Sequence, residues 1–277
     1  MNNPASSLDA IDPDNNHFDA LYDELTTSEF SQYVSIHEYN VSCSNDKGFN
    51  FMTYNVRSFN ANFDTFFAMF KNAASFPEVL CLTETWFNAD NARDIPEYLA
   101  YHTFRTSGRS GGVSVYIRNI FSSSILPNFS ISSESIESCG VELYFNDMSI
   151  IVLVIYRPHS DNVTNFTDVL NLLLETDSLG NKLCVLLGDF NVNILSDDLH
   201  SNNFQYNMHS YQFMPCITKP TRFPSSELYN PSLLDHIWLN KLSYKLTSGI
   251  ILNDCTDHCP LFLKIYFSFY QKDLVIK

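Results

Sequence analysis

The chain has 277 residues, of which 45% are hydrophobic and 14% aromatic, so it can bury a complete core without disulfides or a structural metal. It contains no run of about 18 apolar residues, and residues 1–10 lack the basic start and apolar stretch of a signal peptide. We therefore expect an intracellular protein, nuclear or cytoplasmic, with no membrane partner. The formal net charge of −15 argues against a typical basic DNA-binding domain, although nine acidic residues and one lysine lie within residues 1–50.

Composition divides the chain into three parts. Residues 1–46 are rich in Asn, Asp and Ser, and we predict an acidic, loosely ordered N-terminal leader there. Residues 47–268 contain short apolar runs separated by turn residues and form one predicted domain, followed by a tail at 269–277. Deletion of residues 1–45 is accordingly expected to leave the fold and the chemistry in place.

Eight apolar runs within this domain have the length of buried strands. In chain order they occupy residues 49–54, 79–82, 112–117, 141–145, 150–156, 183–187, 234–239 and 261–267. Helical spacing appears between some of them, at residues 63–74, 163–175 and roughly 202–213. Strands outnumber helices and many connections are too short for crossovers, so we expect mixed sheets covered by a few helices.

Polar residues follow these runs at positions where loops from a sheet edge converge. They supply four carboxylates, two amides, a phenol and an imidazole: Glu84, Asp189, Asp235, Asp257, Asn55, Asn191, Tyr156 and His258. Phosphodiester hydrolysis needs a hard cation on oxygen ligands, for which Glu84 and Asp257 are candidates. The reaction also needs a carboxylate that orients the attacking water, which suits Asp189 with the amides of Asn55 and Asn191. It needs, in addition, groups that contact the phosphate as charge develops.

Each of these motifs also has a structural interpretation. Glu84 is typical of a solvated strand end or a helix cap, residues 188–191 are typical of a turn, and Asp257 could cap a helix. For His236 we favour a structural role. The joint occurrence of six such motifs, each at the end of an apolar run, favours a catalytic site.

The order of these residues resembles the endonuclease/exonuclease/phosphatase superfamily, which includes AP endonucleases and pancreatic-type deoxyribonuclease. The likeness covers about residues 48–267 and is greatest to the endonucleases of non-LTR (LINE) retrotransposons, particularly the CR1/Rex-like branch. The phrases that carry it include Asn55-Val56-Arg57-Ser58, Thr83-Glu84-Thr85-Trp86, Tyr156-Arg157-Pro158 and Leu234-Asp235-His236-Ile237.

The resemblance implies an α/β, DNase-I-like four-layer sandwich of two mixed β-sheets flanked by helices. It implies that Glu84 and Asp257 bind Mg²⁺, which Mn²⁺ can replace, and that Asn55 helps to hold the metal or the phosphate. Asp189 and Asn191 would position the water, Tyr156 would contact the phosphate, and Asp235 would support His258. Such endonucleases normally precede a reverse transcriptase domain in one polypeptide, so that domain and DNA are the expected partners.

Three functions remain open: a DNA-nicking endonuclease, a phosphatase or phosphodiesterase acting on a small molecule or lipid, and a non-catalytic relic. Basic residues near loop ends favour a polyanion such as DNA, although any one of them could be an ordinary solvated charge. The predicted DNA contacts are Arg57, Arg109, Arg157, Lys219 and Arg222, and Arg105 and Arg118 also fall near predicted loop ends.

Overall fold

The computed structural model describes residues 31–268, except for 46–47, 71–74, 107, 109, 147, 160, 177–178, 180–181, 225–229 and 254. The predicted tail at 269–277 and the first 30 residues of the predicted leader lie outside the described residues.

The first sheet contains the strands β1 (Gln32–Ser35), β2 (Phe49–Asn55), β3 (Val79–Thr83), β4 (Tyr98–Thr103), β5 (Val113–Arg118), β12 (Lys245–Leu252) and β13 (Leu261–Tyr266). Their order across the sheet is β1-β12-β13-β2-β3-β5-β4. The pairs β1/β12 and β2/β3 are parallel and the others are antiparallel, so the sheet is mixed.

The second sheet contains β6 (Ser122–Ser132), β7 (Glu137–Phe145), β8 (Met148–Tyr156), β9 (Leu183–Asp189), β10 (Met214–Pro215) and β11 (Asp235–Leu239), in the order β10-β11-β9-β8-β7-β6. Only β8 and β9 run parallel among these pairs. Their parallel pairing places Tyr156 beside Asp189, and the antiparallel pairing of β9 with β11 places Asp189 beside Asp235.

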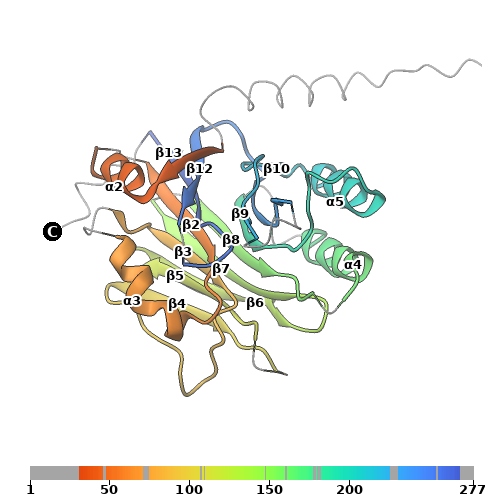
Figure 1. Ribbon diagram of the computed structural model, residues 1–277, viewed down its shortest axis with the longest axis horizontal. Coiled ribbons are helices and arrows are strands. Elements are labelled where there is room, and N and C mark those ends of the chain that lie inside the picture. Colours follow the sequence, from red (N-terminus) through yellow and green to blue (C-terminus); the bar gives the residue numbers. More distant parts are fainter. Residues whose placement is uncertain are drawn as a thin grey trace, which may run out of the picture.

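Four helices of the described residues cover the outer faces of the two sheets: α2 (Ile36–Asn45), α3 (Phe59–Met69), α4 (Val163–Leu174) and α5 (Leu199–Ser210). Figure 1 shows α2 and α3 beside the first sheet and α4 and α5 beside the second. One apolar core lies between the sheets and one lies under each pair of helices. The predicted four-layer, DNase-I-like sandwich is confirmed.

The four-layer arrangement explains why the central strands are continuous apolar runs in the sequence. In β2, Phe49 and Phe51 point into the core between the sheets, whereas Met52 and Tyr54 point into the core under the helices. A strand covered on both faces has no polar face, so alternation disappears from its sequence. None of the helices in the described part of the chain is long and apolar enough to cross a membrane.

Five strands were not predicted from the sequence: β1, β4, β6, β10 and β12. β1, β4, β6 and β10 stand at the edges of the sheets, and most residues of β1, β4 and β6 are partly exposed. Partial exposure permits serine and charged residues, which weakens the apolar signal. Two helices are also displaced: α3 begins at Phe59 rather than residue 63, and α5 occupies Leu199–Ser210 rather than 202–213.

Residues 31–45 correct the predicted boundary of the leader, because they form β1 and α2 of the folded domain. β1 pairs in parallel with β12, from Gln32 opposite Gly249 to Ser35 opposite Leu252. On α2, Tyr39 is fully buried and its hydroxyl donates to the carbonyl of Ser75 at 3.2 Å. The polar composition of this segment concealed a few buried side chains that attach it to the sheet.

Deletion of residues 1–45 is therefore expected to destabilise the protein, contrary to the prediction from sequence. The single substitution Tyr39→Ala tests the packing of α2 against the core. It should lower the free energy of unfolding by about 3 to 5 kcal/mol, as the truncation of a large aromatic side chain in a core does. Urea titration would measure it. Tyr206→Ala is the matched control because Tyr206 is 74% exposed on α5. Equal stability of the Tyr39 and Tyr206 variants would show that α2 contributes nothing to the core.

Candidate active site

The predicted site residues converge at one end of the sandwich. Asn55 ends β2 and Glu84 directly follows β3, and these two strands run parallel in the first sheet. Tyr156 and Asp189 end the parallel strands β8 and β9 of the second sheet. Because parallel strands end at the same edge, each sheet brings its own polar residues together.

The side chain of Asn55 joins the two sheets. Its amide nitrogen donates to Glu84 Oε1 at 2.9 Å and to Asp189 Oδ2 at 2.8 Å, and its amide oxygen accepts from the backbone N–H of Arg57 at 3.2 Å. The amide oxygen is the atom that would bind a metal, and here it faces the backbone. Asn55 thus holds two carboxylates close together, and its predicted part in holding the metal or the phosphate stays a prediction.

The segment from Gly188 to Asn191 fixes the second carboxylate. Gly188 has φ +137°, and an added Cβ would lie 1.9 Å from the carbonyl oxygen of Ile155, so only glycine fits there. The N–H of Asn191 donates to Asp189 Oδ1 at 3.0 Å. The Asn191 amide nitrogen donates to the carbonyl of Arg157 at 2.8 Å, and its buried amide oxygen has no hydrogen-bond partner among the described residues. An acceptor without a partner beside Asp189 is available to an ordered water.

Asp235 and His258 form a buried hydrogen-bonded pair, with 2.8 Å between Asp235 Oδ2 and His258 Nδ1. Thr221 fixes the carboxylate by donating from its hydroxyl to the same oxygen at 3.0 Å. Burial by itself lowers the pKa of His258, but the charge and hydrogen bond of Asp235 outweigh it and raise this pKa to about 9. The imidazole is therefore protonated near neutral pH, with Nε2 as its second donor.

The carboxylates form a site that suits a hard divalent cation. Burial raises the pKa of Asp189 to about 7, and the charges of Asp235 and Glu84 act in the same direction. Negative groups held this close repel one another, and a cation relieves the repulsion. Carboxylate oxygens are the ligands of Mg²⁺ and Mn²⁺. Ligand atoms of Asp189, Asp235 and His258 also lie within 4.8 Å of one another, but Nδ1 of His258 already bonds to Asp235.

The sequence profile of the endonuclease/exonuclease/phosphatase family matches residues 52–258. The chain belongs to this family. A sequence search of curated proteins found no match.

Solved structures of several family members share the fold. The endonuclease domain of TRAS1, a telomere-specific non-LTR retrotransposon, superposes with a TM-score of 0.62 at 12% identity, covering 79% of this chain and 99% of that domain. A 3'-5' exonuclease of Neisseria meningitidis gives 0.58 at 15% identity, with 79% and 100% covered. An AP endonuclease of Archaeoglobus fulgidus gives 0.59 at 15% identity, with 79% and 99% covered.

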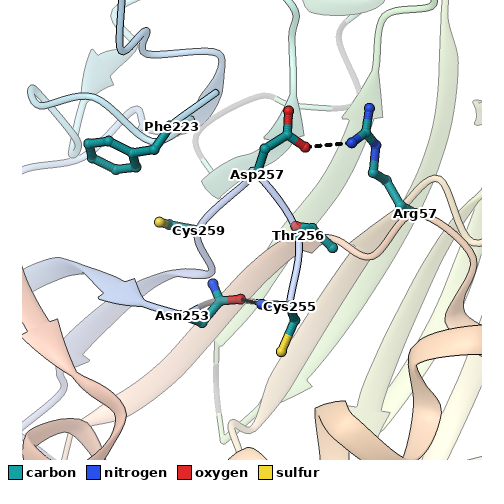
Figure 2. A pocket seen from close by; sticks show the side chains of 7 residues that line it. All are labelled: Arg57, Phe223, Asn253, Cys255, Thr256, Asp257 and Cys259. Carbon is teal, nitrogen blue, oxygen red and sulfur yellow. Dashed lines mark hydrogen bonds and ion pairs between the residues drawn. The ribbon is translucent and has the colours of Figure 1, made fainter. Parts of the chain in front are cut away.

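In this family member Asp257 binds two arginines instead of presenting free oxygens. Arg57 Nη1 lies 2.7 Å from Asp257 Oδ1, and Arg222 Nε lies 2.8 Å from Asp257 Oδ2. Burial acts to raise the pKa of Asp257, but the hydrogen bond from Arg222 and the charges of His258 and Arg57 hold it below its usual value. Arg57 and Asp257 point toward each other (Figure 2). Both residues line a hollow of about 450 Å³. The structure thus gives both oxygens of this predicted metal ligand to guanidinium groups.

The predicted DNA contacts have different outcomes. Arg57 and Arg222 lie beside Asp257, whereas Lys219 is exposed and stays a predicted contact. Arg109 lies outside the described residues. Arg157 does not have the predicted role: it is buried and donates to the carbonyls of Phe190 at 3.0 Å, Asp161 at 2.8 Å and Asn191 at 2.5 Å. Its guanidinium supports the loop after β9 and is not available to DNA.

Glu137 was not predicted as a site residue; it is the first residue of β7 and is fully buried opposite Tyr156 in the sheet. Its carboxylate lies 2.8 Å from Arg105 Nε and accepts a short hydrogen bond from the N–H of Gly112. Burial raises the pKa of Glu137. Residues 130–138 are mostly polar, so no apolar run indicates that β7 begins before residue 141. Arg105 lies at the site because Glu137 anchors it.

His236 has the structural role predicted for it. It is fully buried, stacks on Phe190 with 4.8 Å between the ring centroids, and accepts from Trp238 Nε1 at Nδ1 over 3.2 Å. Burial lowers its pKa to about 4, so the ring is neutral and its Nε2 donates to the carbonyl of Val192 at 3.0 Å.

Proposed function

We propose that this chain is a Mg²⁺-dependent endonuclease that cuts one strand of DNA, of the type that retrotransposons use to start target-primed reverse transcription. The observation that carries the proposal is the joining of Glu84 and Asp189 by the Asn55 amide, next to the Asp235–His258 pair. This arrangement provides oxygen ligands, a carboxylate for water and a cationic donor at one place. Mg²⁺ or Mn²⁺, bound by Glu84, would neutralise the phosphate and polarise its P–O bond.

The residues of the chain divide the remaining tasks. Asp189, fixed by Asn55 and by the N–H of Asn191, accepts a hydrogen bond from the attacking water and takes its proton. His258, oriented by Asp235, donates from Nε2 to a phosphoryl oxygen as negative charge develops there. Burial and then the charges of Glu84 and Asp189 raise the pKa of Tyr156, so its hydroxyl stays protonated and serves as a second donor.

We assign Asp257 to the binding of the DNA backbone through Arg57 and Arg222. Its two ion pairs hold both guanidinium groups near His258, and each group keeps further N–H donors for phosphate oxygens. A pair of fixed cations at the site compensates locally for the acidic charge of the chain. Lys219 would add a further backbone contact.

The substrate class is supported by the likeness to the endonuclease domain of a non-LTR retrotransposon. We further propose a reverse transcriptase domain in the same polypeptide as the partner of this retrotransposon-type endonuclease. The runner-up is a phosphatase or phosphodiesterase acting on a small molecule or lipid. The fold shared with a 3' phosphatase from Neisseria bound to a DNA hairpin, with a TM-score of 0.60 at 14% identity, supports phosphatase chemistry.

Supercoiled plasmid incubated with the protein and Mg²⁺ is expected to become open-circular, because one strand is cut. Excess chelator should abolish this reaction, and Mn²⁺ added beyond the chelator should restore it. A small phosphomonoester and a small phosphodiester serve as parallel substrates. Hydrolysis of the monoester with no cutting of plasmid would replace the proposal with the phosphatase, and full cutting in chelator would exclude the metal.

A further inference from the structure

A second hollow, of about 750 Å³, opens at Ser58, the residue that follows Arg57. Its wall contains Trp86, which lies two residues beyond Glu84 on the loop after β3. Side chains of Asn60, Asn88 and Arg105 line the remainder together with a few neighbours. None of the tasks assigned above uses this hollow, although it adjoins the proposed metal ligand.

The indole of Trp86 is presented to this hollow by a constrained backbone. Trp86 is 40% exposed, whereas Trp238 is completely buried. Its φ of +57° is rare for a bulky residue and persists only where surrounding contacts impose it. These contacts are present: the N–H groups of Thr85 and Trp86 donate to the carbonyls of Gly112 and Gly111 at 3.1 and 2.8 Å. The chain therefore maintains a strained turn that places the indole of Trp86 at the surface.

The polar groups beside Trp86 are fixed as well. Asn60 donates from its amide nitrogen to the carbonyl of Asn91 at 3.0 Å, which joins the start of α3 to the loop that carries Trp86. Arg105 is held by Glu137 at 2.8 Å and by the carbonyl of Ser110 at 2.6 Å. A partly exposed indole among amides and a guanidinium matches a nucleobase with its attached phosphate better than an apolar side chain.

We propose that Trp86 stacks on one unpaired base of the DNA strand, next to the phosphodiester that is cut, while Arg105 contacts an adjoining phosphate. The site would take a single-stranded nucleotide, so the strand must be locally unpaired at the cut. This inference rests on the proposed function for the identity of the strand. Stacking on an aromatic ring needs no particular base, so the contact favours unpaired over paired DNA without selecting a sequence.

The test compares two oligonucleotides of equal length and charge: single-stranded oligothymidylate and the same backbone without bases. The Asp189→Asn variant of the full chain with Mg²⁺, and the unaltered chain with chelator, keep the DNA uncut. Anisotropy of an end label measures affinity. We expect oligothymidylate to bind roughly 5- to 100-fold more tightly than the base-free backbone. Trp86→Ala should remove this difference, and Trp86→Phe should retain most of it.

Fluorescence gives a second measurement on the unaltered chain. The protein has two tryptophans and Trp238 is buried, so stacking on Trp86 should quench the exposed fraction with oligothymidylate and not with the base-free backbone. Tyr206→Ala is the control for loss of an exposed aromatic. An equal loss of affinity for both oligonucleotides in Trp86→Ala, or unchanged fluorescence, would overturn the stacking. The plasmid assay decides the endonuclease separately, because base-dependent quenching does not require cutting.

Discussion

Replacement of Asp189 by Asn is expected to lower the rate of plasmid nicking by a factor on the order of 10² to 10⁴, the range of a lost general base. The amide of Asn accepts no proton from water, although its oxygen can still accept the hydrogen bond from Asn55. The variant should remain folded. Burial and the charges of Asp235 and Glu84 oppose ionisation of Asp189, so a neutral side chain removes repulsion from the native state.

Asp168→Asn makes the same chemical change at an exposed position on α4 and is the matched control. Initial rates on supercoiled plasmid in saturating Mg²⁺ compare the two variants, and thermal unfolding confirms that both are folded. Activity of Asp189→Asn within threefold of the control would remove Asp189 from the chemistry. A folded but inactive control would instead show that the assay responds to surface charge.

Asp235→Asn and His258→Ala are each expected to reduce the single-turnover nicking rate by roughly 10²- to 10³-fold, as the loss of a donor to developing charge does. Because Asp235 acts through His258, the double variant should be little slower than His258→Ala alone. Single-turnover rates of the unaltered chain, the two single variants and the double variant give the double-mutant cycle. Additive losses on a logarithmic scale would mean that the two side chains act separately, despite their 2.8 Å contact.

The pH dependence distinguishes this positioning role from a merely structural one. His258 has a pKa of about 9 in the folded protein, above the usual value of 6.5, so the protonated donor is lost as pH rises through about 9. The rate should therefore fall above that pH. The interaction between His258 and Asp235 stabilises the folded state fully below pH 6.5. This stabilisation is lost as pH rises through about 9. Asp235→Asn removes the main charge that raises this pKa, so the alkaline limb should move toward 6.5.

The sequence determined the core strands and the residues at their ends. The apolar runs at residues 150–156 and 183–187 correspond to β8 and β9, because strands buried on both faces admit few polar residues. Asn55 and Asp189 could be placed near each other because both end such strands, where sheet edges collect loops. The candidate site was recognisable for the same reason, because its residues follow the ends of buried strands.

Only the tertiary structure decided what the charged side chains do. Asp257 was predicted to bind metal, but Arg57, which is 200 residues away in the chain, occupies one of its oxygens. Arg157 was predicted to bind DNA, but the carbonyls of the loop after β9 surround its guanidinium. Burial of Glu137 and the attachment of α2 likewise depend on contacts between distant segments. The local sequence pattern indicates which face of a strand or helix is apolar. Which group pairs with a charged side chain depends instead on how the sheets are arranged in space.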